Sequence, residues 1–374
     1  MKSLTPLLAI SFLIGCDGEK GNVAPSKDSI EEATSETKPP EAVSVNPNLK
    51  YVIKGDTVTI TDCDEAATGE LVIPDTIGGN PVTSIGERAF DQCGSLTSIT
   101  IPDSVTRIGS GAFFGCTSLT SITIGNGVTS IGKNAFEQCR SMTSITIPDG
   151  VTSIGDFAFQ FCESLTSISI PDSVTSIGEG AFLVYAGTLT AAEIGQLTTI
   201  EVGAENLNYA DVNGVLFNKE KTVLHTYPAG KTGDNYVIAN SVTSIGGYAF
   251  IGCSSLTGIT IPDGVTSIGD GAFAECTSLT SVTIPDSVNS IGDIAFGGCT
   301  SMTSITIPDG VTSIGGMAFM GCSSLSAVTF LGDAPKIEDK AFKESSPTIY
   351  READAKGWGD TLAGRPVKLI TEKP

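Results

Sequence analysis

Hydrophobic and polar positions recur along most of this 374-residue chain with a period of 23 residues. Ten Ala-Phe pairs mark the register, and their phenylalanines are Phe90, Phe113, Phe136, Phe159, Phe182, Phe250, Phe273, Phe296, Phe319 and Phe342. Repetition at a fixed period of this length is typical of solenoids, in which each repeat forms one coil and buries its apolar residues against the next coil. The pattern therefore predicts a stack of similar coils.

Within one repeat, the apolar positions predict a short strand followed by a turn. Ile99 and Ile101 flank the polar Thr100, which is the alternation of a half-buried strand. The Pro-Asp-Ser sequence at 102–104 then favours a turn, because proline presets φ and the Asp and Ser side chains bond locally to the backbone. A single coil of this kind has no core of its own, so its stability has to come from its neighbours.

The repeat L-T-S-I-T-I-P-D-[SG]-V-T-S-I-G-x-x-A-F-x-x-C resembles the BspA-type class of bacterial leucine-rich repeats over about residues 70–345. The resemblance implies a β-rich, right-handed leucine-rich-repeat superhelix of 23-residue coils. Its strands line the concave face, and short turns or 3-10 segments lie on the convex side. The resemblance also implies an exported surface protein used for adhesion or ligand binding rather than catalysis.

The pattern divides the repeat region into two blocks, 74–186 and 237–345. Between them, residues 187–236 are expected to form degenerate repeats with a β-hairpin that projects from the solenoid, because two short apolar runs flank a polar turn at 218–221. Both ends of a solenoid expose apolar residues and unpaired backbone, so caps are expected at 48–73 and 346–374. Trp358, the single tryptophan, is interpreted as an anchor of the second cap rather than a platform for a ligand.

The N-terminal segment has the features of an export signal. Residues 1–15 are a short positive start and an apolar run, and 13–16 resemble a lipobox, which implies that Cys16 becomes the acylated first residue of the mature chain. An ordinary secretory signal cleaved elsewhere is the alternative. Residues 16–47 are polar and predict a disordered tether after the lipid. The expected location is the bacterial cell envelope, with the outer-membrane surface favoured over the periplasmic face.

Charge and composition exclude several classes of function. The net charge is −21 and no block of Lys or Arg is present, so nucleic acid is not expected as a partner, and membrane contact is expected through the lipid alone. The chain has one histidine, His225, which excludes Ser-His-Asp triads elsewhere and multi-histidine metal sites. We therefore predict no catalytic residues, no metal and no cofactor.

Two sets of polar or reactive residues recur with the repeat and are interpreted as structural. The cysteines of the repeat are expected to form a ladder of buried free thiols rather than disulfides; they are Cys93, Cys116, Cys139, Cys162, Cys253, Cys276, Cys299 and Cys322. Cys63 stands alone near the N-terminal cap. The aspartates of the Pro-Asp turns are interpreted as solvated turn residues rather than calcium ligands; they are Asp103, Asp149, Asp172, Asp263, Asp286 and Asp309.

The outward side chains of the predicted strands are the candidate binding face, because ladders of hydroxyl groups make a neutral, hydrogen-bonding surface suited to protein or glycan. These residues are Ser98, Thr100, Ser121, Thr123, Ser144, Thr146, Ser281, Thr283, Ser304 and Thr306. Threonine is also a common residue of exposed strands for structural reasons alone. The predicted function is a non-enzymatic envelope lipoprotein that binds a macromolecule, with adhesion as its role. The alternatives are a structural scaffold without a specific ligand and a degradative enzyme that uses the 187–236 insert.

Overall fold

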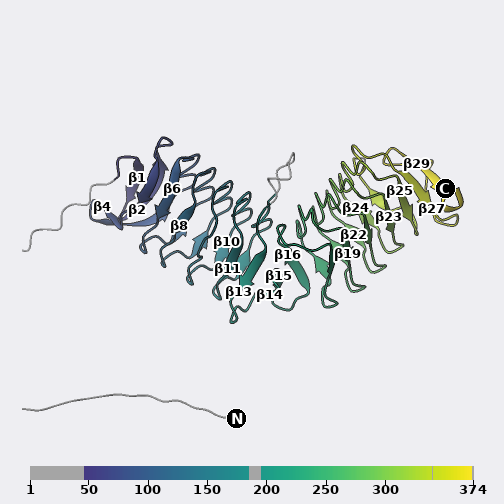
Figure 1. The fold of residues 1–374 in the computed structure, drawn as a ribbon, viewed down its shortest axis with the longest axis horizontal. Helices are drawn as coiled ribbons and strands as arrows, with labels where there is room; N and C mark the ends of the chain where they lie inside the picture. The colour runs from purple at the N-terminus through teal and green to yellow at the C-terminus, as the bar shows by residue number, and fades with distance from the viewer. Residues whose placement is uncertain (1–45, 185–194, 339, 373–374) are drawn as a thin grey trace, which may run out of the picture. The chain divides into compact units, whose positions relative to one another are not determined.

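A computed structural model describes residues 46–184, 195–338 and 340–372, which form a β-solenoid of about 12 coils with almost no helix. Figure 1 shows successive coils lying side by side in chain order. The predicted solenoid of 23-residue coils is thereby confirmed. The predicted signal peptide, Cys16 and residues 17–45 of the tether lie outside the described residues.

One face of the solenoid is formed mainly by strands from the Leu-Thr-Ser-Ile-Thr part of the repeat, which pair in parallel; only β28, near the C-terminus of the described residues, pairs in antiparallel fashion. These strands make three sheets. The first contains β3 (Gly69–Val72), β6 (Leu96–Thr100) and β8 (Ser121–Thr123). The second contains β11 (Ser167–Ile170) and β13 (Thr199–Val202). The third contains β17 (Asn235–Val237), β19 (Gly258–Thr260), β21 (Ser281–Thr283), β23 (Ser304–Ile307), β25 (Ala327–Phe330), β27 (Thr348–Arg351), β29 (Arg365–Leu369) and β28 (Thr361–Leu362).

A second row of strands comes mainly from the Ser-Ile pair in the second half of each repeat and is joined by strands of the N-terminal end and of the hairpin region. Its first sheet contains β1 (Leu49–Lys54), β2 (Thr57–Cys63), β4 (Thr76–Ile77), β5 (Asn80–Ile85), β7 (Arg107–Ile108), β9 (Ser130–Ile131), β10 (Ser153–Ile154) and β12 (Ser176–Ile177). Its second sheet contains β14 (Tyr209–Val212), β15 (Val215–Asn218), β16 (Val223–Thr226), β18 (Ser244–Ile245), β20 (Ser267–Ile268), β22 (Ser290–Ile291), β24 (Ser313–Ile314) and β26 (Lys336–Ile337). We call this row the serine row.

The core consists of columns of equivalent residues from successive coils. The Phe rings stack along the solenoid with centroids 4.9 Å apart for Phe90 and Phe113 and 5.8 Å apart for Phe159 and Phe182. A second stack begins at Tyr227, whose ring lies 5.2 Å from that of Phe250. The spacing is close to the separation of paired strands, about 4.8 Å, so strict periodicity places each ring on the equivalent ring of the next coil.

Short turns fill the side of each coil around the Ala-Phe pair. Around eight of the ten phenylalanines, the residues two before and two after adopt positive φ, as at Gly111 (60°) and Gly115 (70°) around Phe113. Several coils place larger residues there, including the β-branched Ile294 at φ 56°, which is a strained conformation for such a side chain. The described repeats contain turns here and no 3-10 segment; the 3-10 helix η2 (Ile370–Glu372) lies near the C-terminus.

The predicted hairpin forms, but it does not project from the solenoid. β15 pairs with both β14 and β16 in antiparallel fashion, and β16 then runs parallel to β18 as part of the serine row. Leu216 packs into the apolar core of the preceding coils, whereas Val215 and Phe217 pack into the core of the following coils. β15 is therefore buried on both faces, and the expectation of a projecting hairpin is wrong because these apolar residues replace the missing repeat core.

Additional strands cover both ends of the described stack. At the N-terminal end, the antiparallel pair β1–β2 continues the serine row, with β2 parallel to β5. At the C-terminal end, β29 adds to β27. The Trp358 ring lies 5.1 Å from Phe330, and its Nε1 donates to the carbonyl oxygen of Gly332 at 3.3 Å. Trp358 is thus a packing residue of the C-terminal end, as expected.

Candidate binding face

The outward side chains of the three Leu-Thr-Ser-Ile-Thr sheets form one surface, which we call the strand face. In it, Ser98 pairs with Ser121 and Thr100 with Thr123 on adjacent parallel strands. Because neighbouring strands lie about 4.8 Å apart, equivalent hydroxyl groups repeat at that interval along the solenoid. Nine of the ten predicted residues are exposed, and Ser98 is half-buried.

The second repeat block extends the same columns. Thr283 pairs with Thr306, while Ser281 lies opposite Gly258 and Ser304 lies opposite Ala327. The structure thus places the hydroxyl groups of this block on the strand face, although the serine column is interrupted by residues without a hydroxyl.

The coil that contains Ser144 and Thr146 differs from the others. Both side chains are exposed, but residues 142–148 are not assigned to a strand, so the sheet is interrupted between β8 and β11. These two hydroxyl groups therefore belong to the surface without being held by a paired strand.

Several residues of the strand face were not predicted because they lie where the sequence departs from the repeat. Val72 and Val237, at the first strands of their sheets, are 63% and 69% exposed. Glu201 pairs with Ser169, whose hydroxyl donates to its carboxylate at 3.4 Å. Alignment of the strands in the 23-residue register could have identified these positions. Each one aligns with an outward position that is Ser or Thr in other coils.

The hydroxyl groups of the strand face differ in bonding from those of the neighbouring threonine column. The Oγ1 of Thr120 donates to the carbonyl oxygen of Thr97 at 3.0 Å, and that of Thr280 donates to Thr257 at 3.1 Å. Within the described part of the chain, none of the ten predicted face residues makes a side-chain hydrogen bond of this kind. Their donors and acceptors remain available to a partner.

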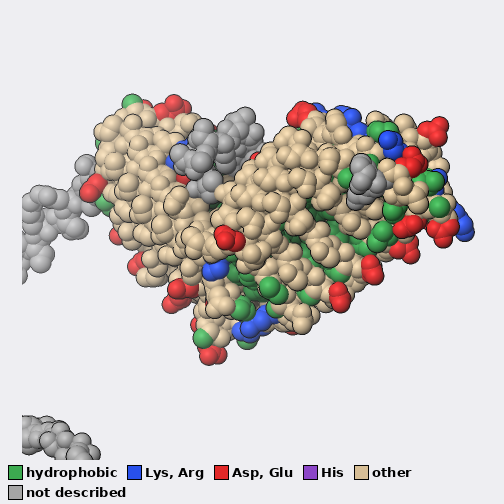
Figure 2. Space-filling view, turned by 45° about the vertical axis from the view of Figure 1, so that its right-hand side comes forward, with side chains coloured by type: hydrophobic (Ala, Val, Ile, Leu, Met, Phe, Trp, Pro, Cys, Tyr) green, Lys and Arg blue, Asp and Glu red, His purple; other side chains and the backbone are tan. Residues whose placement is uncertain are grey.

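The ten predicted residues of the strand face are uncharged although the chain is strongly acidic, because all of them are Ser or Thr. Charged side chains occur at other positions of the face: Glu70 lies opposite Ser98, Glu201 opposite Ser169, and the exposed Lys368 opposite Tyr350. In Figure 2, charged side chains lie mostly along the edges of the visible surface, while its middle is tan, the colour of uncharged polar side chains and backbone, with a band of green hydrophobic side chains. Recognition by such a surface would depend on hydrogen bonds and shape rather than on ion pairs.

The repeat cysteines lie inside the solenoid as free thiols. In six coils the Sγ donates to the carbonyl oxygen of the phenylalanine of the preceding coil, as for Cys116 with Phe90 at 3.2 Å and Cys322 with Phe296 at 3.0 Å. Burial raises the pKa of the Cys322 thiol to about 12. Ser345 occupies the next position of the ladder and donates to Phe319 at 2.6 Å. The ladder thus joins successive coils by hydrogen bonds.

Two of the six turn aspartates, Asp103 and Asp172, also join coils. Asp103 accepts a hydrogen bond from the backbone N–H of Asn126 at 2.7 Å, and Asp172 accepts one from Glu205 at 3.0 Å. Across the described residues, no group of three or more His, Cys, Asp or Glu side chains is arranged to hold a metal ion. Asp103 and Asp172 thus bind the backbone of the next coil.

His225 lies on β16, in the second sheet of the serine row. Its Nδ1 is 2.8 Å from the Oγ1 of Thr226, and its ring meets the edge of Tyr209 at a centroid distance of 6.1 Å. Burial lowers the pKa of His225. The hydroxyl oxygen of Tyr209 accepts a hydrogen bond from the backbone N–H of Ile177, the last residue of β12, at 2.8 Å. Tyr209, on the second sheet, thus accepts a hydrogen bond from the last strand of the first sheet, and His225 packs against Tyr209.

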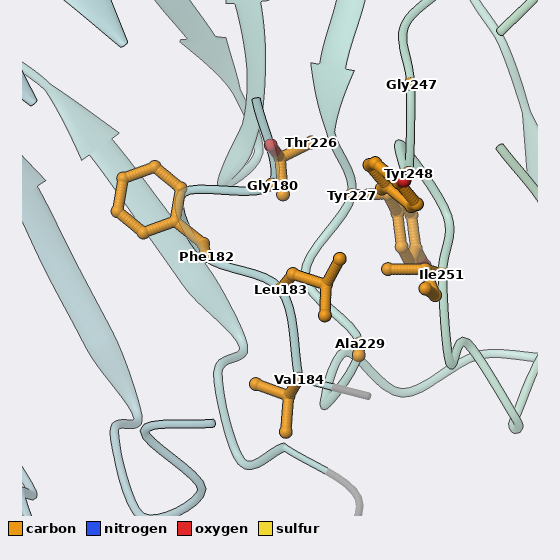
Figure 3. A pocket seen from close by; sticks show the side chains of 10 residues that line it. All are labelled: Gly180, Phe182, Leu183, Val184, Thr226, Tyr227, Ala229, Gly247, Tyr248 and Ile251. Atoms are coloured by element: carbon orange, nitrogen blue, oxygen red, sulfur yellow. The ribbon is translucent and has the colours of Figure 1, made fainter. Parts of the chain in front are cut away.

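A small cavity marks the same junction. Figure 3 shows its lining, which comes from the coils before and after the hairpin and includes Phe182, Leu183, Tyr227, Tyr248 and Ile251. Its volume is about 20 Å³, which is room for a single water molecule. This cavity is too small for a substrate.

Comparison with protein families identifies the repeat. A family model described as the BspA type leucine-rich repeat region matches six copies, over residues 83–204 and 230–348. The chain belongs to the BspA-type leucine-rich-repeat family. The resemblance seen in the sequence is thereby confirmed. A comparison with curated protein sequences finds no match.

Solved structures of other bacterial leucine-rich-repeat proteins have the same fold. A leucine-rich cell-surface protein from Faecalibacterium prausnitzii is 30% identical, with a TM-score of 0.55, over 84% of this chain and 98% of its own. A leucine-rich-repeat protein from Eubacterium ventriosum is 30% identical, with a TM-score of 0.58, over 82% of this chain and 84% of its own. The pneumococcal vaccine antigen PcpA is 22% identical, with a TM-score of 0.58, over 83% of this chain and 93% of its own, and shows the fold alone.

None of the described residues of this BspA-type chain forms a helix with the length and apolar character that a membrane crossing requires.

Proposed function

We propose that this chain is a non-enzymatic protein of the bacterial cell envelope that binds an extracellular protein or a polysaccharide through its strand face, with adhesion as its role. The supporting observation is the set of outward hydroxyl groups that have no hydrogen-bond partner within the described fold, repeated on a rigid stack of coils. The similarity to a protein described as a bacterial cell-surface protein supports the location. No cofactor is needed for this function.

Preorganisation is the physical basis of the proposal. A strand side chain held by its neighbours loses little conformational freedom on binding, so hydrogen bonds to a partner retain more of their free energy. The threonines of the neighbouring column stabilise the backbone of these strands through their own hydrogen bonds, as between Thr120 and Thr97. The surface hydroxyl groups are therefore positioned before a partner arrives.

Substitution of the strand face tests the proposal. We expect the variant with Ser121→Lys and Thr123→Lys to lose binding to extracellular matrix proteins or glycans, because two long cations would block the face, while its circular dichroism and melting temperature are retained. A matched control is Ser153→Lys in the serine row, where Arg107 already occupies an equivalent exposed position. If cell adhesion and pull-down are unchanged while the variant is folded, the face does not bind the partner. A structural scaffold without a specific ligand would then be the better explanation.

We also propose that residues 1–15 are a signal peptide, that Cys16 carries the lipid and that residues 16–47 are a tether to the folded coils. Labelling cells with a fatty-acid analogue tests the first step, because wild-type protein should take up the label and Cys16→Ser should not. Protease treatment of intact cells then distinguishes the outer surface, where the coils are digested, from the periplasmic face, where they are protected.

A further inference from the structure

Cys63 and Cys93 lie against each other in the interior, where the N-terminal strands meet the first full coil. Cys63 is the last residue of β2, and Cys93 is the first member of the cysteine ladder. The Sγ of Cys93 lies 3.8 Å from the carbonyl oxygen of Cys63 and 3.8 Å from that of Asp64, and the Sγ of Cys63 also lies 3.8 Å from Asp64 O. Both sulfur atoms thus approach one peptide carbonyl group. Cys63 is not alone, contrary to the expectation from sequence.

This contact differs from those of the six ladder cysteines that follow a phenylalanine coil. There the sulfur has a close carbonyl acceptor, at 3.2 Å from Cys116 to Phe90 and at 3.3 Å from Cys139 to Phe113. Cys93 has no phenylalanine coil before it, so its acceptors are the more distant oxygens of the cap. A hydrogen bond between the two thiols lowers the pKa of Cys63 and raises that of Cys93, in agreement with direct contact of the side chains.

We propose that Cys63 and Cys93 form a disulfide bond in the exported protein, which fixes the N-terminal strands to the first repeat coil. The structure holds both residues as thiols, and the bond requires the oxidising surroundings that export provides, so this part rests on the proposed location.

The oxidant is a disulfide, either of a thiol–disulfide oxidoreductase or of oxidised glutathione. The Cys63 thiolate attacks one sulfur of the oxidant, forms a mixed disulfide and releases the first thiol. The Cys93 thiolate then attacks the Cys63 sulfur, forms the intramolecular S–S bond and releases the second thiol. Two protons and two electrons pass from the protein thiols to the oxidant. Because Cys63 and Cys93 are 2% and 0% exposed, the exchange takes place while the end strands are open, during folding.

The end of a repeat stack is where such a bond has most effect. Terminal repeats have a neighbour on one side only and open before the interior. A bond across 30 residues of sequence limits the conformations of the open end and so favours closure. The edge strand β1 carries exposed Tyr51, Val52 and Ile53, so its release would uncover more apolar surface beside an unpaired strand edge.

Differential thiol labelling tests the bond directly. The full chain is expressed in bacteria, quenched in acid, unfolded in denaturant so that the buried thiols are accessible, and alkylated with one reagent; it is then reduced and alkylated with a second. Trypsin gives peptides 55–88 and 89–107, each with one cysteine, and 134–140, which carries Cys139 as the control. We expect a linked pair of the first two peptides before reduction and the second label on Cys63 and Cys93 afterwards. Cys139 should carry the first label.

A missing Cys63–Cys93 bond can be distinguished from a failure of export and from a failure of ligand binding. Cell fractionation shows whether the chain left the cytoplasm, and the bond is then read from the exported fraction. First label on Cys63 and Cys93 to the same extent as on Cys139 overturns the proposal. If the chain stays in the cytoplasm, purified protein refolded with oxidised and reduced glutathione decides by the same peptides. Neither reading depends on the strand face.

A stability measurement gives an independent readout. Reductant should lower the melting temperature of the wild-type chain and speed tryptic cleavage after Lys54 by about tenfold or more, because the end strands then open freely. Cys63→Ser should remove the response to reductant, whereas Cys139→Ser should retain it. A wild-type chain that melts and is cleaved identically with and without reductant overturns the proposal.

Discussion

The stacked phenylalanines offer a quantitative test of how the coils stabilise one another. Phe296 is fully buried, and its ring lies 5.2 Å from Phe273 and 5.5 Å from Phe319. Replacing a buried phenylalanine by alanine costs about 3–5 kcal/mol. We expect Phe296→Ala to fall at the upper end of that range, because two ring contacts are lost, each contributing about 0.5–1.5 kcal/mol beyond burial.

Phe342→Ala is the matched control. Phe342 is 1% exposed, so the same atoms are removed from the same burial, but its ring stacks on Phe319 at 5.4 Å and ends the column. The control should therefore be less destabilising than Phe296→Ala by about one ring contact, roughly 0.5–1.5 kcal/mol.

Urea unfolding measures the difference. Fluorescence of Trp358 reports on the C-terminal coils, and far-ultraviolet circular dichroism reports on all of them. Both variants should lower the urea midpoint, and equal slopes justify a comparison of free energies. If Phe342→Ala is as destabilising as Phe296→Ala or more so, the stacking of rings adds nothing to burial and the reasoning is refuted.

Three further changes test other contacts by urea or thermal unfolding. Cys322→Ser should cost less than about 1 kcal/mol, because Ser345 shows that a hydroxyl can make the ladder hydrogen bond. Cys322→Ala should cost about 0.5–1.5 kcal/mol, because it removes one of the two hydrogen bonds to the carbonyl oxygen of Phe296, which still accepts from the backbone N–H of Cys299 at 3.3 Å. Gly271→Ala should destabilise by about 1–2 kcal/mol or more, since φ is 58° and a Cβ would lie 2.6 Å from the Tyr248 ring. Burial lowers the pKa of His225 below 6.5, so the unfolded chain binds the proton more readily. Stability should therefore fall as pH decreases through about 6.5 towards the folded pKa, and His225→Gln should remove this part of the pH dependence of the melting temperature.

The repeated core could be predicted because each interior coil meets the same surroundings. A residue such as Phe136 has equivalent neighbours before and after it, so the period alone places its ring on the next. The outward direction of Ser121 and Thr123 followed from strand alternation in the same way. Where the 23-residue register is kept, the sequence of one coil therefore predicts both its own conformation and how it packs on the adjacent coil.

Two identical segments of the chain show that strand pairing cannot be predicted from the sequence of a segment alone. Residues 141–155 and 301–315 are the same fifteen letters. Residues 304–307 form β23, which pairs with β25, yet the equivalent residues 144–147 are assigned to no strand. Strand pairing depends on the neighbouring coils, so the same fifteen residues form a paired strand in one copy and no strand in the other. The sequence of the segment alone could not have predicted this difference.

Contacts between different parts of the chain were likewise beyond the repeat pattern. The separation of Phe182 and Phe250 is 68 residues, one fewer than three periods, and the loss of register indicated an irregular segment without showing that β15 is buried on both faces. Cys63 lies outside the 23-residue spacing, so nothing in the sequence placed it beside Cys93. Both features follow from tertiary packing.

The strand face is interrupted between β8 and β11 and again between β13 and β17, so Ser121 and Ser304 lie in separate parts of it, and this separation gives a way to recognise the size of the partner. An extended polysaccharide laid along the solenoid would contact both parts, so substitutions at Ser121 and at Ser304 would each weaken binding and their free-energy effects would add, since distant sites act independently. A compact protein that covers one part would respond to one substitution and ignore the other. Measuring binding for the two single variants and the double variant therefore distinguishes the two classes of partner even before the ligand is identified.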